Sequence, residues 1–146
     1  SFYESLLQKG IENYDKAINL NPDDADAHNN RGIAKAGLKQ YEEAMQDYEK
    51  AIELDPKSAE AYSNRGEVYF RLGQYEDAMG YYEKAIELNP KYAEAYCNRG
   101  NVKLKLGKYP EAIEEYDKAL AINPDLTEAY DNRKEAQDKL NENNKA

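Results

Sequence analysis

Few residues in this sequence could do covalent or metal chemistry. His28 is the only histidine and Cys97 the only cysteine. Structural zinc sites need about four nitrogen, sulfur or carboxylate ligands, and this pair cannot supply such a set. A reactive thiolate needs a positively charged surround, whereas Glu94 stands one helical turn before Cys97. We therefore expect an inert thiol and a packed histidine, with no catalytic residue, no metal and no cofactor.

Carboxylates are the other candidates for chemistry, because paired acids can act as general acid and base. That work requires a pocket that separates the two pKa values, and no such pocket is suggested by the sequence. Negative charge near a helix start also complements the helix dipole. We predict that the pairs form a solvated face. They are Glu42 and Glu43, Glu76 and Asp77, and Glu114 and Glu115.

One polar residue recurs at a fixed interval. Asn30, Asn64, Asn98 and Asn132 follow one another at a spacing of 34 residues. An amide both donates and accepts hydrogen bonds, so a row of amides could hold the backbone of an extended peptide whatever its side chains. Alternatively, each amide bonds to a neighbouring helix. The sequence leaves both interpretations open.

The same spacing governs the whole chain. Pro22, Pro56, Pro90 and Pro124 each close a phrase of the form K-A-[IL]-x-[LI]-[ND]-P. Regular self-similarity at a period of 20 to 50 residues is the signature of a repeat architecture. The chain is therefore built from one copied unit.

Two helices fit each unit. In the middle unit, apolar and small residues recur at spacings of three and four over 59–72 and again over 75–88, which is the period of a helix. Gly73 separates the two segments, as a residue that tolerates positive φ should. Pro90 then ends the second helix. Helix pairs of this length must stack to bury their apolar stripes.

These residues resemble the tetratricopeptide repeat, whose pattern combines aromatic, Gly, Tyr, Ala and Pro positions. The three units match it as His28, Gly32, Tyr41, Ala44, Tyr48, Ala51 and Pro56; as Tyr62, Gly66, Tyr75, Ala78, Tyr82, Ala85 and Pro90; and as Tyr96, Gly100, Tyr109, Ala112, Tyr116, Ala119 and Pro124. The resemblance implies an all-α, right-handed α-solenoid superhelix of stacked antiparallel helix pairs.

The resemblance also divides the chain. We expect one domain over 1–146, with an unpaired second-type helix in 1–22 and a capping helix and tail in 125–146. Three full repeats lie between them, at 25–56, 59–90 and 93–124.

Two features of the repeat carry structural expectations. Gly32, Gly66 and Gly100 should each meet the Ala of the second helix where the two helices cross, since only small residues allow a close approach. The sequence also departs from the pattern, because arginine replaces the leucine before each of these glycines. We expect the arginine stems to cover apolar surface while their charges reach water.

In tetratricopeptide arrays one face of the first helices lines a concave groove, and the asparagines would lie on it. Their spacing is similar to the asparagine ladder in the repeats of the O-linked N-acetylglucosamine transferase, which implies backbone binding by Asn30, Asn64 and Asn98. The acidic row of Asp26, Glu60, Glu94 and Glu128 would favour a basic or polar peptide. The remaining expected groove residues are Glu67, Asn101, Phe70 and Leu104.

Co-chaperone members of the family grip an acidic chaperone tail with lysines, an arginine and asparagines. Here Asn64 matches one asparagine, but Glu94 and Asn98 stand at the positions of a lysine and the arginine. An anionic tail would meet like charge. We therefore expect no docking of such a tail.

The N-terminal helix has no first helix to cover its apolar residues, which are Phe2, Tyr3, Leu6, Leu7 and Ile11. Such a patch fits a fragment of a longer array, a homo-oligomer or a domain swap. It also fits a terminus that merely contacts the first full repeat. An assembly module is therefore an alternative function, and a regulatory segment of a larger enzyme is another.

The net charge and the distribution of apolar residues exclude some classes of partner. The net charge is -9 and the isoelectric point about 4.7, whereas nucleic-acid binding needs a clustered basic face. No run of 18 apolar residues could span a membrane, and no secretory signal opens the sequence. We expect a cytoplasmic scaffold that binds a protein or peptide.

Overall fold

The chain is seen in a computed structural model that describes residues 1–145, and these residues form eight α-helices and no strand. The helices are α1 (Phe2–Leu20), α2 (Ala25–Gly37), α3 (Tyr41–Leu54), α4 (Ala59–Arg71), α5 (Tyr75–Leu88), α6 (Ala93–Lys105), α7 (Tyr109–Ile122) and α8 (Thr127–Lys145). The expected C-terminal tail ends at Ala146, which lies outside the described residues.

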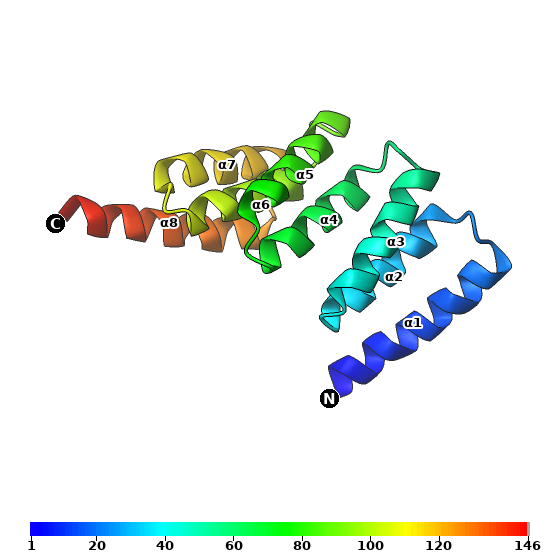
Figure 1. Ribbon diagram of the computed structural model, residues 1–146. Coiled ribbons are helices and arrows are strands. Elements are labelled where there is room, and N and C mark those ends of the chain that lie inside the picture. Colours follow the sequence, from blue (N-terminus) through cyan, green and yellow to red (C-terminus); the bar gives the residue numbers. More distant parts are fainter. Residues whose placement is uncertain (146) are drawn as a thin grey trace.

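The helices stack in chain order as antiparallel pairs (Figure 1). The pairs α2–α3, α4–α5 and α6–α7 make the most extensive contacts, and each pair packs on the next. The blue α1 lies at one end of the stack and the red α8 at the other. The expected all-α solenoid is confirmed. We call α2, α4, α6 and α8 the first helices, and α1, α3, α5 and α7 the second helices.

The phrase [ND]-P makes the turn that follows each second helix. A proline disfavours helical backbone in the residue before it, and Asn21, Asp55, Asn89 and Asn123 each leave the helix at this point, with φ between -132° and -141°. Each side-chain oxygen then accepts a hydrogen bond from the backbone N–H two residues on, at 3.1–3.2 Å. This turn repeats four times because the dipeptide repeats four times.

The bend inside each pair requires left-handed backbone. Gly73 and Gly107 adopt φ of 77° and 76°, which confirms the expectation for Gly73. Lys39 occupies the equivalent place in the first repeat and adopts φ of 62°. A side chain is strained in this region, so the first bend is held by its surroundings rather than by its residue type.

The crossing inside each pair is set by a glycine and a tyrosine ring. A Cβ atom added to Gly32, Gly66 or Gly100 would lie 2.6–2.8 Å from a ring carbon of Tyr48, Tyr82 or Tyr116. These rings are at most 2% exposed. The alanines that we expected to meet the glycines are buried too, but the nearest side chain is the tyrosine. The glycine thus makes room for an aromatic ring.

One repeat position carries an arginine four times, at Arg31, Arg65, Arg99 and Arg133. The charges of the first three were expected to reach water, but all four side chains are largely shielded. Their side chains are only 19–27% exposed. In three of them a guanidinium nitrogen lies 2.7–2.9 Å from a carboxylate 16 residues earlier, on the preceding second helix. The pairs are Arg31 with Asp15, Arg65 with Glu49, and Arg133 with Asp117. A guanidinium that is largely shielded needs such partners because it has lost most of its contact with water.

Glu115 is a correction to the predicted solvated face, since it is only 1% exposed. Arg99 donates two hydrogen bonds to its carboxylate, and Lys103 lies 3.7 Å away. Burial alone would raise the pKa of Glu115. The hydrogen bond from Arg99 and the charges of Lys103 and Lys118 outweigh burial, so the net pKa lies below its ordinary value. Asp47 fills the same role in the first repeat, where it accepts two hydrogen bonds from Arg31.

In the middle repeat the arginine packs against an aromatic ring in place of a buried carboxylate. Tyr81 stands where the other repeats have Asp47 and Glu115, and the guanidinium of Arg65 lies 4.8 Å from the centre of its ring. Tyr69 replaces the lysine and stacks on Tyr81 with ring centres 5.2 Å apart. An aromatic stack with a cation over its face thus replaces a buried ion cluster.

The N-terminal helix is only partly uncovered. Ile11 is 7% exposed and Leu7 packs against Gly37, so both residues contact the first full repeat. Phe2, Tyr3 and Leu6 are 84%, 61% and 57% exposed. Ile11 is thus covered within the chain and Leu7 partly so, and the oligomer contact through the helix stays a prediction.

Replacing Gly66 with alanine should destabilise the fold by about 1–3 kcal/mol, because the added methyl overlaps Tyr82 in a crossing that cannot widen freely. Gly80 is the matched control. It lies inside α5 with no atom within 4 Å of an added Cβ, so Gly80→Ala should stabilise the chain by about 1 kcal/mol through helix propensity. Urea unfolding followed by circular dichroism measures both. Equal effects of the two changes would contradict the crossing.

Replacing Glu115 with glutamine should lower the free energy of unfolding by about 2–4 kcal/mol at about pH 7, because it leaves Arg99 half-paired. A carboxyl whose folded pKa is lowered stabilises the fold above its unfolded pKa, and this stability is lost as pH falls through the folded pKa. Stability should therefore decline less toward about pH 3 in the variant than in the wild type. Glu114→Gln, at the exposed neighbour, should leave both quantities nearly unchanged.

Candidate first-helix groove

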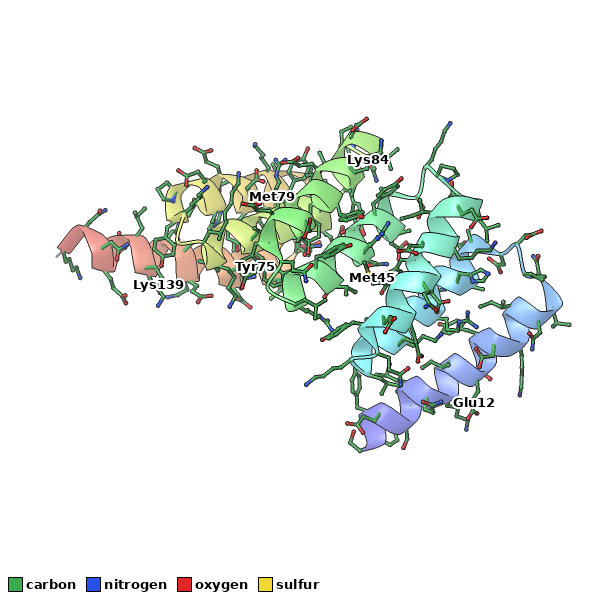
Figure 2. The ribbon with its side chains drawn as sticks, in the orientation of Figure 1. Glu12, Met45, Tyr75, Met79, Lys84 and Lys139 are labelled. Atoms are coloured by element: carbon green, nitrogen blue, oxygen red, sulfur yellow. The ribbon has the colours of Figure 1, made fainter. Side chains whose placement is uncertain are left out.

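The candidate site is the first-helix face, which we define by the residues at the same repeat positions on α2, α4, α6 and α8. The 34-residue period repeats each position on every first helix. The face contains Asp26, Asn29, Asn30, Ile33, Glu60, Ser63, Asn64, Glu67, Phe70, Glu94, Cys97, Asn98, Asn101, Leu104, Glu128, Asn132 and Glu135. Figure 2 draws side chains along the stack, and its labelled Met45 and Met79 lie on the second helices α3 and α5.

The asparagine ladder bonds first helix to first helix. Asn64 Nδ2 donates to Asn29 Oδ1 at 3.0 Å, and Asn98 Nδ2 donates to Ser63 Oγ at 3.2 Å. The partner stands 35 residues earlier in both cases, on the adjacent first helix. The sequence left open whether the asparagines bind a peptide backbone or a neighbouring helix. In this structure Asn64 and Asn98 bond to a neighbouring helix.

This bond leaves the amides with hydrogen-bonding capacity. An asparagine amide has two N–H groups and an oxygen with two lone pairs, and one N–H is used here. Asn64 and Asn98 are half-buried, while Asn30 is exposed at the end of the row. The helix-to-helix bonds fix the orientation of the amides, so a role in binding a backbone stays a prediction.

The acidic row is exposed on this face. Asp26, Glu60, Glu94 and Glu128 stand near the starts of the four first helices, where the carboxylates complement the helix dipole. Partial burial, assisted by the charges of Glu60 and Glu94, raises the pKa of the neighbouring Tyr92 to about 12. The row therefore places four exposed carboxylates along one edge of the first-helix face.

A hollow of about 200 Å³ lies at the C-terminal end of the face, and we call it the C-terminal hollow. It brings together Phe70, Asn101 and Leu104, which the sequence analysis assigned to the groove. Its other lining residues are Lys105, Glu128, Asn132 and Glu135. Lys105 and Glu135 were not predicted from the sequence, although the 34-residue register relates Glu135 to Asn101.

Asn101 organises this hollow. Its Oδ1 atom accepts hydrogen bonds from Tyr116 Oη and Asn132 Nδ2, both at 2.8 Å. Its Nδ2 atom donates to Glu128 Oε1 at 3.3 Å. Because Tyr116 is fully buried, the network holds the amide and one carboxylate on a rigid support.

The middle of the face carries a cation that the sequence analysis also missed. Arg71 lies 2.9 Å from Glu67 Oε1, one turn earlier on α4, and donates to the backbone oxygen of Ala36 at 3.4 Å. Glu67, assigned to the groove from the sequence, is therefore already paired. The groove is not uniformly acidic along its length.

The two residues considered for covalent or metal chemistry are both buried. His28 is 6% exposed, and its Nε2 atom lies 2.9 Å from the backbone oxygen of Pro22. Cys97 is 1% exposed. Burial, with the charges of Glu128 and Glu94, raises the pKa of its thiol to about 12, which leaves it protonated near neutral pH.

Among residues 1–145, no group of three or more His, Cys, Asp or Glu side chains is placed to hold a metal ion. Nor does that part of the chain contain a helix long and apolar enough to cross a bilayer.

Stacked helix pairs with a polar face on the first helices define a class of helical repeat protein. Models described as "TPR repeat" match residues 7–39, 37–73 and 66–107, and one described as "Tetratricopeptide repeat" matches 93–126. These matches cover most of the sequence, and the chain belongs to the tetratricopeptide repeat family. Domains of this family are protein-interaction modules.

Solved structures with similar folds are tetratricopeptide domains. The first TPR domain of human RPAP3 has a TM-score of 0.77 and 28% identity, over 84% of this chain and 96% of that one. The Sgt2 TPR domain from Aspergillus fumigatus has a TM-score of 0.77 and 26% identity, over 84% and 82%.

One similar structure contains a ligand. The first TPR of Spaghetti (RPAP3), bound to the HSP90 peptide SRMEEVD, has a TM-score of 0.73 and 29% identity, over 80% of this chain and 92% of that one. The comparison with curated proteins gives no match.

The Cys97 thiol should react slowly in the folded chain. With its pKa raised to about 12, the thiolate fraction is about a thousandfold below that of a free cysteine. Ellman's reagent at about pH 7 should label the unfolded chain in urea at least about a hundredfold faster than the native chain. Comparable rates in the two states would show that the thiol is accessible and contradict its burial.

Proposed function

We propose that this chain binds an extended polypeptide segment carrying lysine or arginine along its first-helix face. The observation that carries the proposal is the exposed acidic row beside the oriented amides of Asn64 and Asn98. The amides supply hydrogen bonds to a backbone, and the carboxylates select the sign of the side chains. An extended ligand fits because its groups repeat along a line, as the helices do.

The charge argument separates this chain from the relative with a peptide ligand. That peptide, SRMEEVD, ends in acidic residues. On the first-helix face of this chain, Glu60, Glu94 and Glu128 would repel such an end, since like charges brought together cost several kcal/mol. The shared fold supports a peptide ligand here, while the side chains favour the opposite charge.

The test begins with selection of ligands from a random library of peptides of about twelve residues displayed on phage. Peptides enriched on the wild-type chain should carry an excess of lysine and arginine. Their affinity should fall at least tenfold, by an estimate of about 1.4 kcal/mol or more, in the double variant Glu60→Lys/Glu94→Lys. Isothermal titration calorimetry measures this change.

The matched control is Glu53→Lys/Glu87→Lys. These two glutamates lie on the second helices, are 71% and 72% exposed and make only pairs with lysines three residues earlier, and their reversal changes the net charge by the same amount. Binding should survive in this control. Enrichment of acidic peptides, or equal loss of affinity in the two double variants, would refute the proposed groove.

A further inference from the structure

We propose that the C-terminal hollow is an anchor pocket for one lysine or arginine side chain of the bound segment. The inference rests on the proposed function, which it makes specific by naming a subsite and its occupant. Phe70 and Leu104 supply apolar walls, whereas Glu128 and Glu135 supply negative charge. A side chain with an apolar stem and a cationic head combines the same two properties.

The positions of the two carboxylates suit a single cationic head. Glu128 and Glu135 lie seven residues apart on α8, two turns along the same side of the helix, which is about 10 Å. Asn132 lies between them and also lines the hollow. A head group placed over Asn132 is therefore about 5 Å from each carboxylate along the helix. Phe70 adds an aromatic ring to the lining, and the face of such a ring attracts cations.

The charge of the hollow also fits one cation. Glu128 and Glu135 carry two negative charges, and the exposed Lys105 at the rim carries one positive charge. One added cation makes the group neutral. Lys105 offsets one of the two carboxylate charges, so one negative charge remains for a ligand to match. A second bound cation would be repelled by Lys105 and by the first.

The hollow is preorganised by a support that does not depend on the ligand. Asn101 accepts from the buried Tyr116 and from Asn132, and it donates to Glu128. The carboxylate is thus held before a ligand arrives, which lowers the entropy lost on binding. The side-chain oxygen of Asn132 and the remaining lone pairs of Glu128 are hydrogen-bond acceptors, which suits them to a guanidinium or ammonium group.

The preceding repeat provides an internal comparison. One period earlier, Ala36 stands in the place of Phe70, so the aromatic wall is missing. Glu67 stands in the place of Asn101 and is paired with Arg71 at 2.9 Å. In the middle repeat the chain's own Arg71 therefore pairs with the single carboxylate of Glu67. Lys105 stands in the place of Arg71 at the C-terminal hollow, which contains two carboxylates, so one negative charge remains there for the ligand to match.

The experiment uses a probe that does not require a known partner. The ¹⁵N-labelled wild-type chain is titrated by NMR with N-acetyl-arginine amide and N-acetyl-lysine amide up to about 50 mM, a range that detects weak millimolar binding. N-acetyl-citrulline amide is the neutral control of nearly the same shape. At least one cationic probe should shift backbone signals of α6 and α8 around Asn101 and Asn132, whereas citrulline should not.

The pocket variant is Glu128→Gln/Glu135→Gln, and a glutamine at position 128 still offers an oxygen to Asn101. It should reduce affinity for the cationic probe at least about tenfold. The control variant Glu53→Gln/Glu87→Gln removes the same number of charges from the second helices and should bind as the wild type does. Matching far-ultraviolet circular dichroism and melting temperatures establish that all variants are folded.

Two results would overturn the anchor pocket: no shift around Asn101 with either cationic probe, or a shift that the pocket variant retains in full. Neither would by itself remove the proposed function, because the library-selected peptides could still depend on Glu60 and Glu94. Conversely, a specific cationic shift in the hollow without any selected peptide would support the pocket and refute the extended groove. The two failures are therefore distinguishable.

Discussion

The structure depends on a crossing so close that one added carbon at a first-helix glycine would overlap a tyrosine ring. At Gly66 that carbon would lie 2.8 Å from Tyr82. Interiors packed at this density deform only at a cost, so the three crossings fix how each first helix lies on its second helix. The spacing of neighbouring first helices follows, and with it the 3.0 Å and 3.2 Å bonds of Asn64 and Asn98. The geometry of the first-helix face is thus a consequence of the crossing.

Charge has two separate roles in the stack. Between the helices, Arg31 and Arg99 each pair with a carboxylate on the next helix, Asp47 and Glu115. Each charge needs such a partner because most water is excluded there. On the first-helix face, carboxylates of the acidic row remain exposed and available to a ligand. The middle repeat shows that the internal role can be filled otherwise, by Arg65 over the ring of Tyr81. The internal pairs are therefore a packing solution rather than evidence of catalysis.

Several elements were predictable because they are local. The dipeptide of Asn or Asp with Pro specifies the turn after each second helix, and Gly73 specifies left-handed backbone. Helix periodicity predicted the pairs and their stacking. The arginines and Glu115 were not predictable in the same way. Long charged side chains are usually exposed, so the sequence predicts exposure for them. Their burial is favourable only when an oppositely charged side chain on another helix lies within reach.

For the candidate groove, the sequence by itself determined which residues share a face, because a 34-residue period repeats the same helix position in every unit. It therefore placed Asn64, Asn98 and the acidic row together. Tertiary structure decided how each side chain is used: Glu67 is paired with Arg71, whereas Asn101 joins Tyr116 to the C-terminal hollow. The physical reason is that a repeat pattern records position along the helix, while hydrogen-bond partners and enclosed space depend on distances between helices.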